Sequence, residues 1–110
     1  MKRFNLPLFA LASVVFASSS VAFADEASTQ ALLKDSKCLK CHSVDKKKSG
    51  PSFKETAAKY KGKADAETKL YTHLTTAPMV EVDGEKEKHT MIKTKDEAAI
   101  KEVVAFILKQ

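Results

Sequence analysis

The chain is poor in the residues that commonly staple small proteins or interrupt their helices. Its 110 residues contain two cysteines, three glycines, three prolines and no tryptophan. A disulfide between cysteines so close in the chain would close a tiny loop and add little stability. Arginine occurs only at Arg3, so there is no arginine cluster or aromatic-interleaved basic stretch of the kind that binds nucleic acid. The sequence therefore argues against both a disulfide scaffold and a nucleic-acid-binding protein.

The N-terminal region has the pattern of a secretory signal peptide. A positive start at residues 2–3 precedes a mostly apolar stretch at 6–16, and Ala22 and Ala24 satisfy the small-x-small cleavage pattern. The continuous apolar run is shorter than the roughly 20 residues that a membrane-spanning helix needs. We therefore predict that residues 1–24 are cleaved off after Ala24 and that the mature protein is exported to the periplasm without a membrane span.

The mature chain, residues 25–110, has the size of one mildly basic domain. Removal of 24 of the 110 residues leaves 86, a length at which the hydrophobic core is thin and a staple is usually needed. The formal net charge of +5 falls to +3 when Lys2 and Arg3 leave, and every remaining basic residue is lysine. Compact ammonium groups suit diffuse attraction to acidic partners, although they also serve solubility alone. No repeat or linker indicates a second domain, and we expect a monomer.

Both cysteines belong to a C-x-x-C-H motif, Cys38-Leu39-Lys40-Cys41-His42. This is the attachment pattern of a c-type haem. Each thiol bonds one vinyl group of the haem, and the adjacent imidazole is held under the iron. Thioredoxin-like enzymes also use C-x-x-C, but they place it beside a βαβ pattern, which is absent here. The motif predicts one covalent haem on Cys38 and Cys41, with the iron bound by His42.

The rest of the chain predicts an all-α fold of about four short helices around the haem. Ser52 and Glu55 have the spacing of a capping box. Thr94 and Glu97 have the same spacing ahead of a strongly amphipathic C-terminal segment. Only Met79–Val82 shows the brief alternation of a strand. The predicted helices cover residues 28–37, 52–61, 65–75 and 94–108, with Phe53, Ala57, Tyr60, Leu70, Leu74, Ile100, Val104 and Ile107 facing inward.

With these features the mature chain resembles the small bacterial class I cytochromes c, which carry one haem. The resemblance rests on the helix leading into the motif, on Gly50-Pro51 after it, and on the amphipathic helices of the C-terminal half. It implies that Cys38 and Cys41 form thioethers and that His42 binds iron through Nε2. It also implies that the Pro51 carbonyl accepts a hydrogen bond from the other nitrogen of that ring, and that the first and last helices cross.

The sixth iron ligand is where the sequence departs from the family. Relatives usually supply a methionine sulfur from the loop before the last helix. With Thr94 as the helix cap, His89 lies five residues ahead of it and Met91 only three, which leaves little chain to turn from iron to helix. We therefore predict His89 as the sixth ligand and keep Met91 as the alternative. Met79 is less favoured, and His73 or no protein ligand stays open.

Two strong axial ligands favour electron transfer over catalysis, because they leave no position at the iron open for a substrate. We predict a soluble periplasmic one-electron carrier, not an enzyme, that shuttles between membrane-associated complexes of a respiratory chain. Its partners would be transient redox proteins with acidic docking surfaces. The alternative is a haem-based peroxidase or small-gas sensor, which requires a weak or absent sixth ligand. A dedicated subunit of a larger complex is a third reading.

Overall fold

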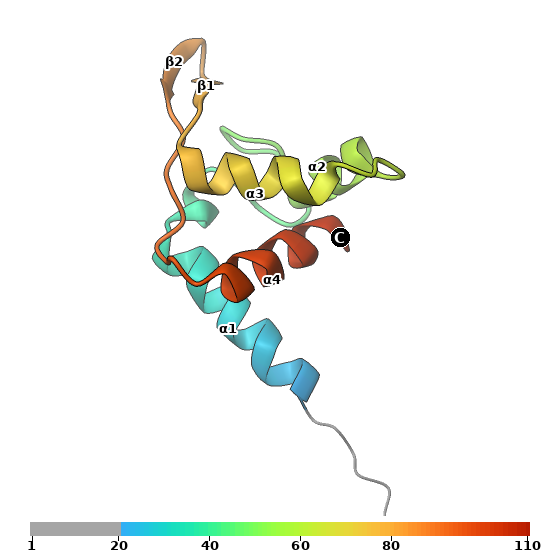
Figure 1. Ribbon diagram of the computed structural model, residues 1–110. Coiled ribbons are helices and arrows are strands. Elements are labelled where there is room, and N and C mark those ends of the chain that lie inside the picture. The colour runs from blue at the N-terminus through green and yellow to red at the C-terminus, as the bar shows by residue number, and fades with distance from the viewer. Residues whose placement is uncertain (1–20) are drawn as a thin grey trace, which may run out of the picture.

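The computed structural model describes residues 21–110 and shows a small group of packed helices with one hairpin beside it (Figure 1). Residues 1–20, most of the predicted signal peptide, lie outside the described residues, and its cleavage stays a prediction. Within the described part, no helix is long and apolar enough to cross a membrane. In chain order the elements are α1 (Val21–Asp35), the 3-10 turn η1 (Cys38–Lys40), α2 (Phe53–Tyr60), α3 (Ala66–Thr76), β1 (Met79–Val82), β2 (Glu85–Lys88) and α4 (Glu97–Leu108).

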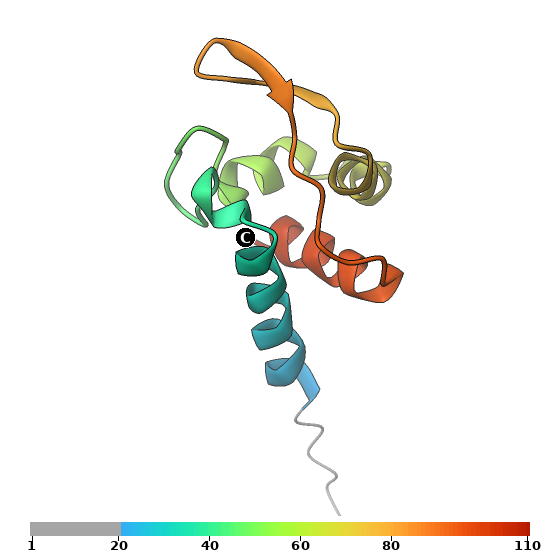
Figure 2. The same cartoon turned by 90° about the vertical axis from the view of Figure 1, so that its left-hand side faces the viewer.

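Helix α4 lies at the centre of the fold. Helices α1, α2 and α3 each pack on it, and Figures 1 and 2 show α1 and α4 crossing, as the family resemblance implied. Apolar residues recur every three or four positions along α4, which places them on one broad face. Val103, on that face, has an exposed fraction of 0%. The core consists of Leu33, Phe53, Leu70, Leu74, Ile92, Ile100, Val103, Val104, Phe106 and Ile107.

Helix α2 begins at the predicted capping box. The Ser52 hydroxyl accepts a hydrogen bond from the Glu55 amide at 3.1 Å, and the Glu55 carboxylate accepts one from the Ser52 amide at 2.9 Å. These bonds satisfy amides that the first turn of a helix leaves without partners. Phe53 and Ala57 are buried, and Tyr60 packs against the core from its edge. The prediction for this helix is confirmed.

The start of α4 differs from the prediction. Asp96, not Thr94, is the N-terminal cap, because its carboxylate accepts a hydrogen bond from the Ala98 amide at 3.0 Å. The Thr94 hydroxyl accepts instead from the Asp96 amide at 3.1 Å. Thr94 therefore shapes the turn that leads into the helix. The Ser/Thr-x-x-Glu spacing was misleading here because an aspartate, an equally good cap, stands closer to the first helical turn.

The segment after α3 forms an antiparallel hairpin where the sequence indicated only a brief strand. Alternate residues of β1 are half-buried, whereas every residue of β2 is exposed and charged. Strand β2 thus carries no hydrophobic alternation, and it was not predicted. It is held by pairing with β1, in a register that sets Val82 opposite Glu85. The turn at Asp83-Gly84 has φ of 51° and 85°, the positive values that tight hairpin turns favour.

The two candidate caps of α4 can be separated by mutation. Asp96→Ala should lower the free energy of unfolding by about 1 kcal/mol, because it leaves the first turn of α4 without its side-chain acceptor. Thr94→Ala should cost clearly less, since only an exposed turn contact is lost. Chemical denaturation of the two variants beside the parent protein measures both values. A larger loss for Thr94→Ala would contradict the observed start of the helix.

Candidate haem site

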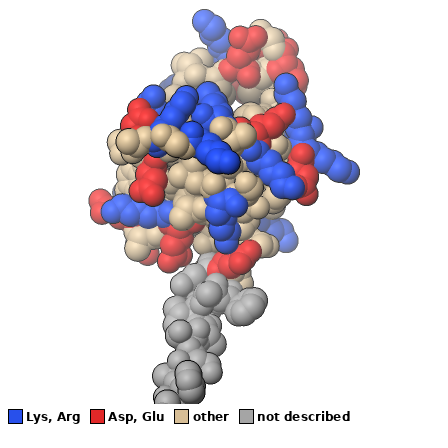
Figure 3. All heavy atoms as spheres, turned by 90° about the vertical axis from the view of Figure 1, so that its right-hand side faces the viewer, with Lys and Arg blue, Asp and Glu red and all other residues tan. Residues whose placement is uncertain are grey.

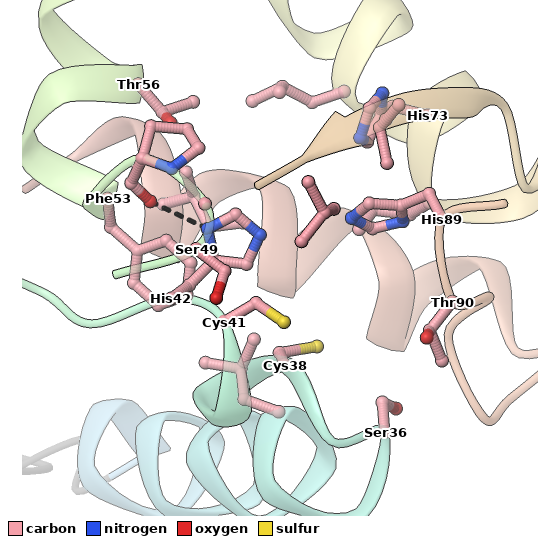
Figure 4. A pocket seen from close by; sticks show the side chains of 18 of the residues that line it. Ser36, Cys38, Cys41, His42, Ser49, Phe53, Thr56, His73, His89 and Thr90 are labelled. Atoms are coloured by element: carbon pink, nitrogen blue, oxygen red, sulfur yellow. Dashed lines mark hydrogen bonds between the residues drawn. The ribbon is translucent and has the colours of Figure 1, made fainter. Parts of the chain in front are cut away.

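A cavity of about 440 Å³ lies between the C-x-x-C-H turn, α2, α3 and the hairpin. Cys38, Cys41 and His42 line it from one side, and His73 and His89 line it from another (Figure 4). The structure therefore brings the predicted attachment cysteines and both predicted axial histidines to one cavity. Apolar side chains of the core, Leu70 and Leu74 of α3 among them, complete its lining.

The C-x-x-C-H motif folds as a tight turn directly after α1. Cys38 begins η1, and its carbonyl accepts a hydrogen bond from the His42 amide at 3.0 Å. This turn places both sulfur atoms on the cavity side, where Figure 4 shows them pointing toward the space between His42 and His89. Both thiols are free and half-buried. Burial raises the pKa of the Cys38 thiol, so its S–H form predominates at neutral pH.

The imidazole of His42 is held in one orientation and one tautomer. Its Nδ1 lies 2.7 Å from the Pro51 carbonyl oxygen. Because a carbonyl can only accept, Nδ1 carries the proton and Nε2 is left as the nitrogen that can bind a metal. The ring of Phe53 stacks against the His42 ring at a centroid distance of 5.7 Å. The contact with Pro51 that the resemblance implied is present.

Gly50 gives the His42 ring the room it needs. A Cβ added at Gly50 would lie 2.5 Å from Cε1 of His42 and 2.9 Å from Nδ1. Its backbone amide donates to the Cys41 carbonyl at 2.9 Å, so the loop cannot easily move away. In the sequence, Gly50 is recognisable only as part of a family pattern. Its specific role depends on a close approach between residues that are not neighbours in the chain.

His89 stands opposite His42 in the cavity. The ring centroids are 6.2 Å apart and the ring planes are inclined by 46°. With metal–nitrogen bonds of about 2 Å and ring centres about 1 Å behind the nitrogens, two imidazoles on opposite sides of one metal ion have centroids about 6 Å apart. The Nδ1 atom of His89 is buried without a hydrogen-bond partner among the described residues. The spacing fits an iron bound between the two rings.

His73 of α3 lies against His89. Their ring centroids are 4.3 Å apart, with an edge of one ring toward the other. Burial lowers the pKa of both histidines, and the nearby His42 ring adds to the effect at His89. Both side chains are therefore neutral at pH 7, the form of imidazole that binds metals. The position of His73 could be anticipated, because it follows Leu70 and precedes Leu74 on the buried face of α3.

The candidate methionines point elsewhere. Met79 and Met91 have exposed fractions of 58% and 51%, and neither lines the cavity. The amide of Ile92 donates to the Leu74 carbonyl at 3.0 Å, and Ile92 is buried in the core. This anchor turns Ile92 inward and leaves its neighbour Met91 at the surface.

Comparison with known proteins places the chain among haem proteins. A family model described as cytochrome c matches residues 27–110. Cytochrome c-551 of Stutzerimonas stutzeri is 38% identical over 74 residues, which cover 67% of each chain. Cytochrome c-552 of Nitrosomonas europaea is 45% identical over 70 residues, 64% of this chain and 62% of that protein. Cytochrome c-551 of Pseudomonas aeruginosa is 44% identical over 41 residues, and the match spans only 39% of its length.

Solved structures give the same picture. The crystal structure of the class 1 cytochrome MtoD from Sideroxydans lithotrophicus ES-1 superposes with a TM-score of 0.74 and 45% identity. The match covers 77% of this chain and 95% of that one. Wild-type cytochrome c552 of Nitrosomonas europaea superposes with a TM-score of 0.56 and 29% identity, over 72% of this chain and 95% of that one.

The close approach of Gly50 to His42 can be tested by substitution. Gly50→Ala should displace the imidazole and alter the absorption and paramagnetic NMR signals of the bound haem, because the added methyl group overlaps the ring. Gly62→Ala is the matched control, since a Cβ there meets no atom within 4 Å. At its φ of 76° the control should lose on the order of 1 kcal/mol of stability with unchanged haem signals. Unaltered haem signals in Gly50→Ala would contradict the tight packing.

Proposed function

Because the chain belongs to the cytochrome c family, we propose that it is a soluble periplasmic protein that carries single electrons between membrane-associated redox complexes of a respiratory chain. Family membership gives it one covalently attached haem c and the role of a haem-based electron carrier. The haem iron supplies reversible one-electron chemistry between Fe(III) and Fe(II). The observation that carries the finer proposal is the pair of imidazoles, His42 and His89, facing each other across the cavity.

Three residues on one side of the cavity, Cys38, Cys41 and His42, would hold the haem and bind its iron. Cys38 and Cys41 are the residues for the two thioether bonds, since their sulfurs lie in the cavity on one tight turn. His42 is the proximal ligand through Nε2. The hydrogen bond from its Nδ1 to Pro51 increases the basicity of the ring and keeps it in place when the charge on the iron changes.

His89 is the proposed ligand on the other side. Its ring has the spacing from His42 that a shared metal requires, whereas both candidate methionines are more than half exposed. A thioether favours Fe(II) and raises the reduction potential. An imidazole is the stronger donor to Fe(III), so a carrier with two histidine ligands should have a lower potential than relatives with a histidine and a methionine.

Two protein ligands at the iron favour electron transfer over catalysis, because they leave no coordination position open for a substrate. Little reorganises when the iron changes charge, because neither His42 nor His89 has to leave. The cavity is lined largely by apolar groups, as cofactor sites usually are. These features support a carrier rather than the alternative haem-based peroxidase or small-gas sensor, and we propose that the protein is not an enzyme.

Lysines are suited to attract acidic redox partners. Lys37, Lys59 and Lys88 line the cavity, where an electron would enter and leave. Lysines also spread, mixed with carboxylates, over the face shown in Figure 3, so the charge is not gathered into one patch. The Lys48 ammonium donates to the Leu39 carbonyl at 2.9 Å and thus holds the loop against the motif. We infer weak, salt-sensitive docking of transient partners near the cavity.

The ligand and the function can be tested together in the holoprotein. His89→Ala should lose the low-spin spectrum and bind carbon monoxide stoichiometrically after reduction, because one axial position becomes vacant. Met91→Ala is the control and should behave like the parent protein, low-spin and without measurable binding of carbon monoxide. Absorption spectra of the oxidised, reduced and gas-treated proteins give both the spin state and the binding of carbon monoxide.

Two outcomes would overturn the proposal in different ways. Loss of the low-spin spectrum in Met91→Ala, with a normal spectrum in His89→Ala, would assign the sixth position to the methionine and leave the carrier function standing. Rapid binding of carbon monoxide by the parent protein would instead favour the peroxidase or sensor.

A further inference from the structure

The two histidines that face the cavity are held in very different ways. His42 is fixed by the Pro51 carbonyl, by the stacked ring of Phe53 and by the close backbone of Gly50. The buried Nδ1 atom of His89 has no hydrogen-bond partner among the described residues. Its backbone amide donates to the Pro78 carbonyl at 2.8 Å. That bond fixes the backbone position of His89 but not the rotation of its ring.

The ring of His73 lies against the ring of His89. It meets the His89 ring edge-on, with centroids 4.3 Å apart and planes inclined by 61°, and Figure 4 shows it close beside His89. His73 is carried by α3, whose position is set by the buried side chains of Leu70 and Leu74. The bond from the Ile92 amide to the Leu74 carbonyl ties the segment after His89 to the same helix. Both rings are therefore anchored to one rigid element.

We propose that His73 is a positioning residue for the sixth ligand: its ring sets the rotation of the His89 imidazole and thereby the 46° inclination between the two axial rings. The inference rests on the proposed function, because it takes His89 to be bound to the haem iron. His73 itself does not bind the metal. It acts by packing against His89, as the residues around metal ligands generally orient those ligands. On the other side of the cavity, Pro51 has the corresponding role for His42.

The angle between two axial imidazole planes determines how the iron d orbitals split, and the g-values of oxidised low-spin iron report that splitting. This readout is specific, because a change in overall stability does not move it. It also separates positioning from ligation. Loss of a ligand converts the spectrum to high spin, whereas rotation of a ligand leaves it low-spin with shifted g-values.

The experiment compares low-temperature EPR spectra of the oxidised holoprotein and four variants. His73→Ala and His73→Leu remove the flat ring edge and should stay low-spin, with the largest g-value shifted beyond the scatter of the controls. Two removals are used because Ala at this half-buried position leaves unfilled space that Leu occupies. His73→Phe keeps the ring edge and should retain the parent g-values. Thr72→Ala, at the exposed neighbouring position on α3, should leave them unchanged.

Three results would overturn the inference. Parent g-values in both His73→Ala and His73→Leu would show that the contact does not set the rotation. A shift in His73→Phe equal to that in His73→Ala would show that the aromatic edge is not what matters. Conversion of His73→Ala to high spin would make His73 a ligand. Failure of the assignment of His89 as the sixth ligand is detected separately, because a sulfur ligand would show in the spectrum of the oxidised parent protein without any substitution.

Discussion

The distance between the imidazoles of His42 and His89 is the constraint on which this structure depends. Their centroids lie 6.2 Å apart, the separation expected when one iron joins two rings from opposite sides. The two residues come from opposite parts of the fold, a turn after α1 and a segment after the hairpin. Helix α4 packs against α1, α2 and α3, and so holds both supports at a fixed separation. A haem bound there would connect the two halves through the middle of a thin core.

The two sides of the cavity are built by different means. On the His42 side, the imidazole is held in one orientation by a hydrogen bond, by a stacked ring and by the backbone of a glycine. On the His89 side, the backbone is anchored to the end of α3, and the ring is confined by packing against another histidine. A site of this kind has one rigid face, suited to holding the cofactor. In the proposed function, the properties of the iron would be adjusted through the other face, where His89 stands in place of the methionine that the family resemblance implies.

The features that the sequence predicted correctly are those whose residues lie close together in the chain. The C-x-x-C-H turn, the capping box at Ser52 and the amphipathic pattern of α4 all lie within a few residues, so spacing alone was sufficient. The cap at Asp96 was missed because two good capping residues compete within three positions. Strand β2 was missed because none of its residues is buried, so pairing rather than hydrophobicity holds it. The contacts of Gly50 with His42 and of His73 with His89 join distant segments, and no sequence pattern measures such distances.

The central claim is that the iron lies between two imidazoles, and X-ray absorption fine structure at the iron edge of the oxidised parent protein tests it most directly. The method counts the atoms bonded to the metal and distinguishes nitrogen from sulfur. The account predicts six nitrogen neighbours, four from the haem and one each from His42 and His89, with no sulfur. A sulfur atom in the first coordination shell would contradict it, because only a methionine such as Met91 or Met79 could then complete the site.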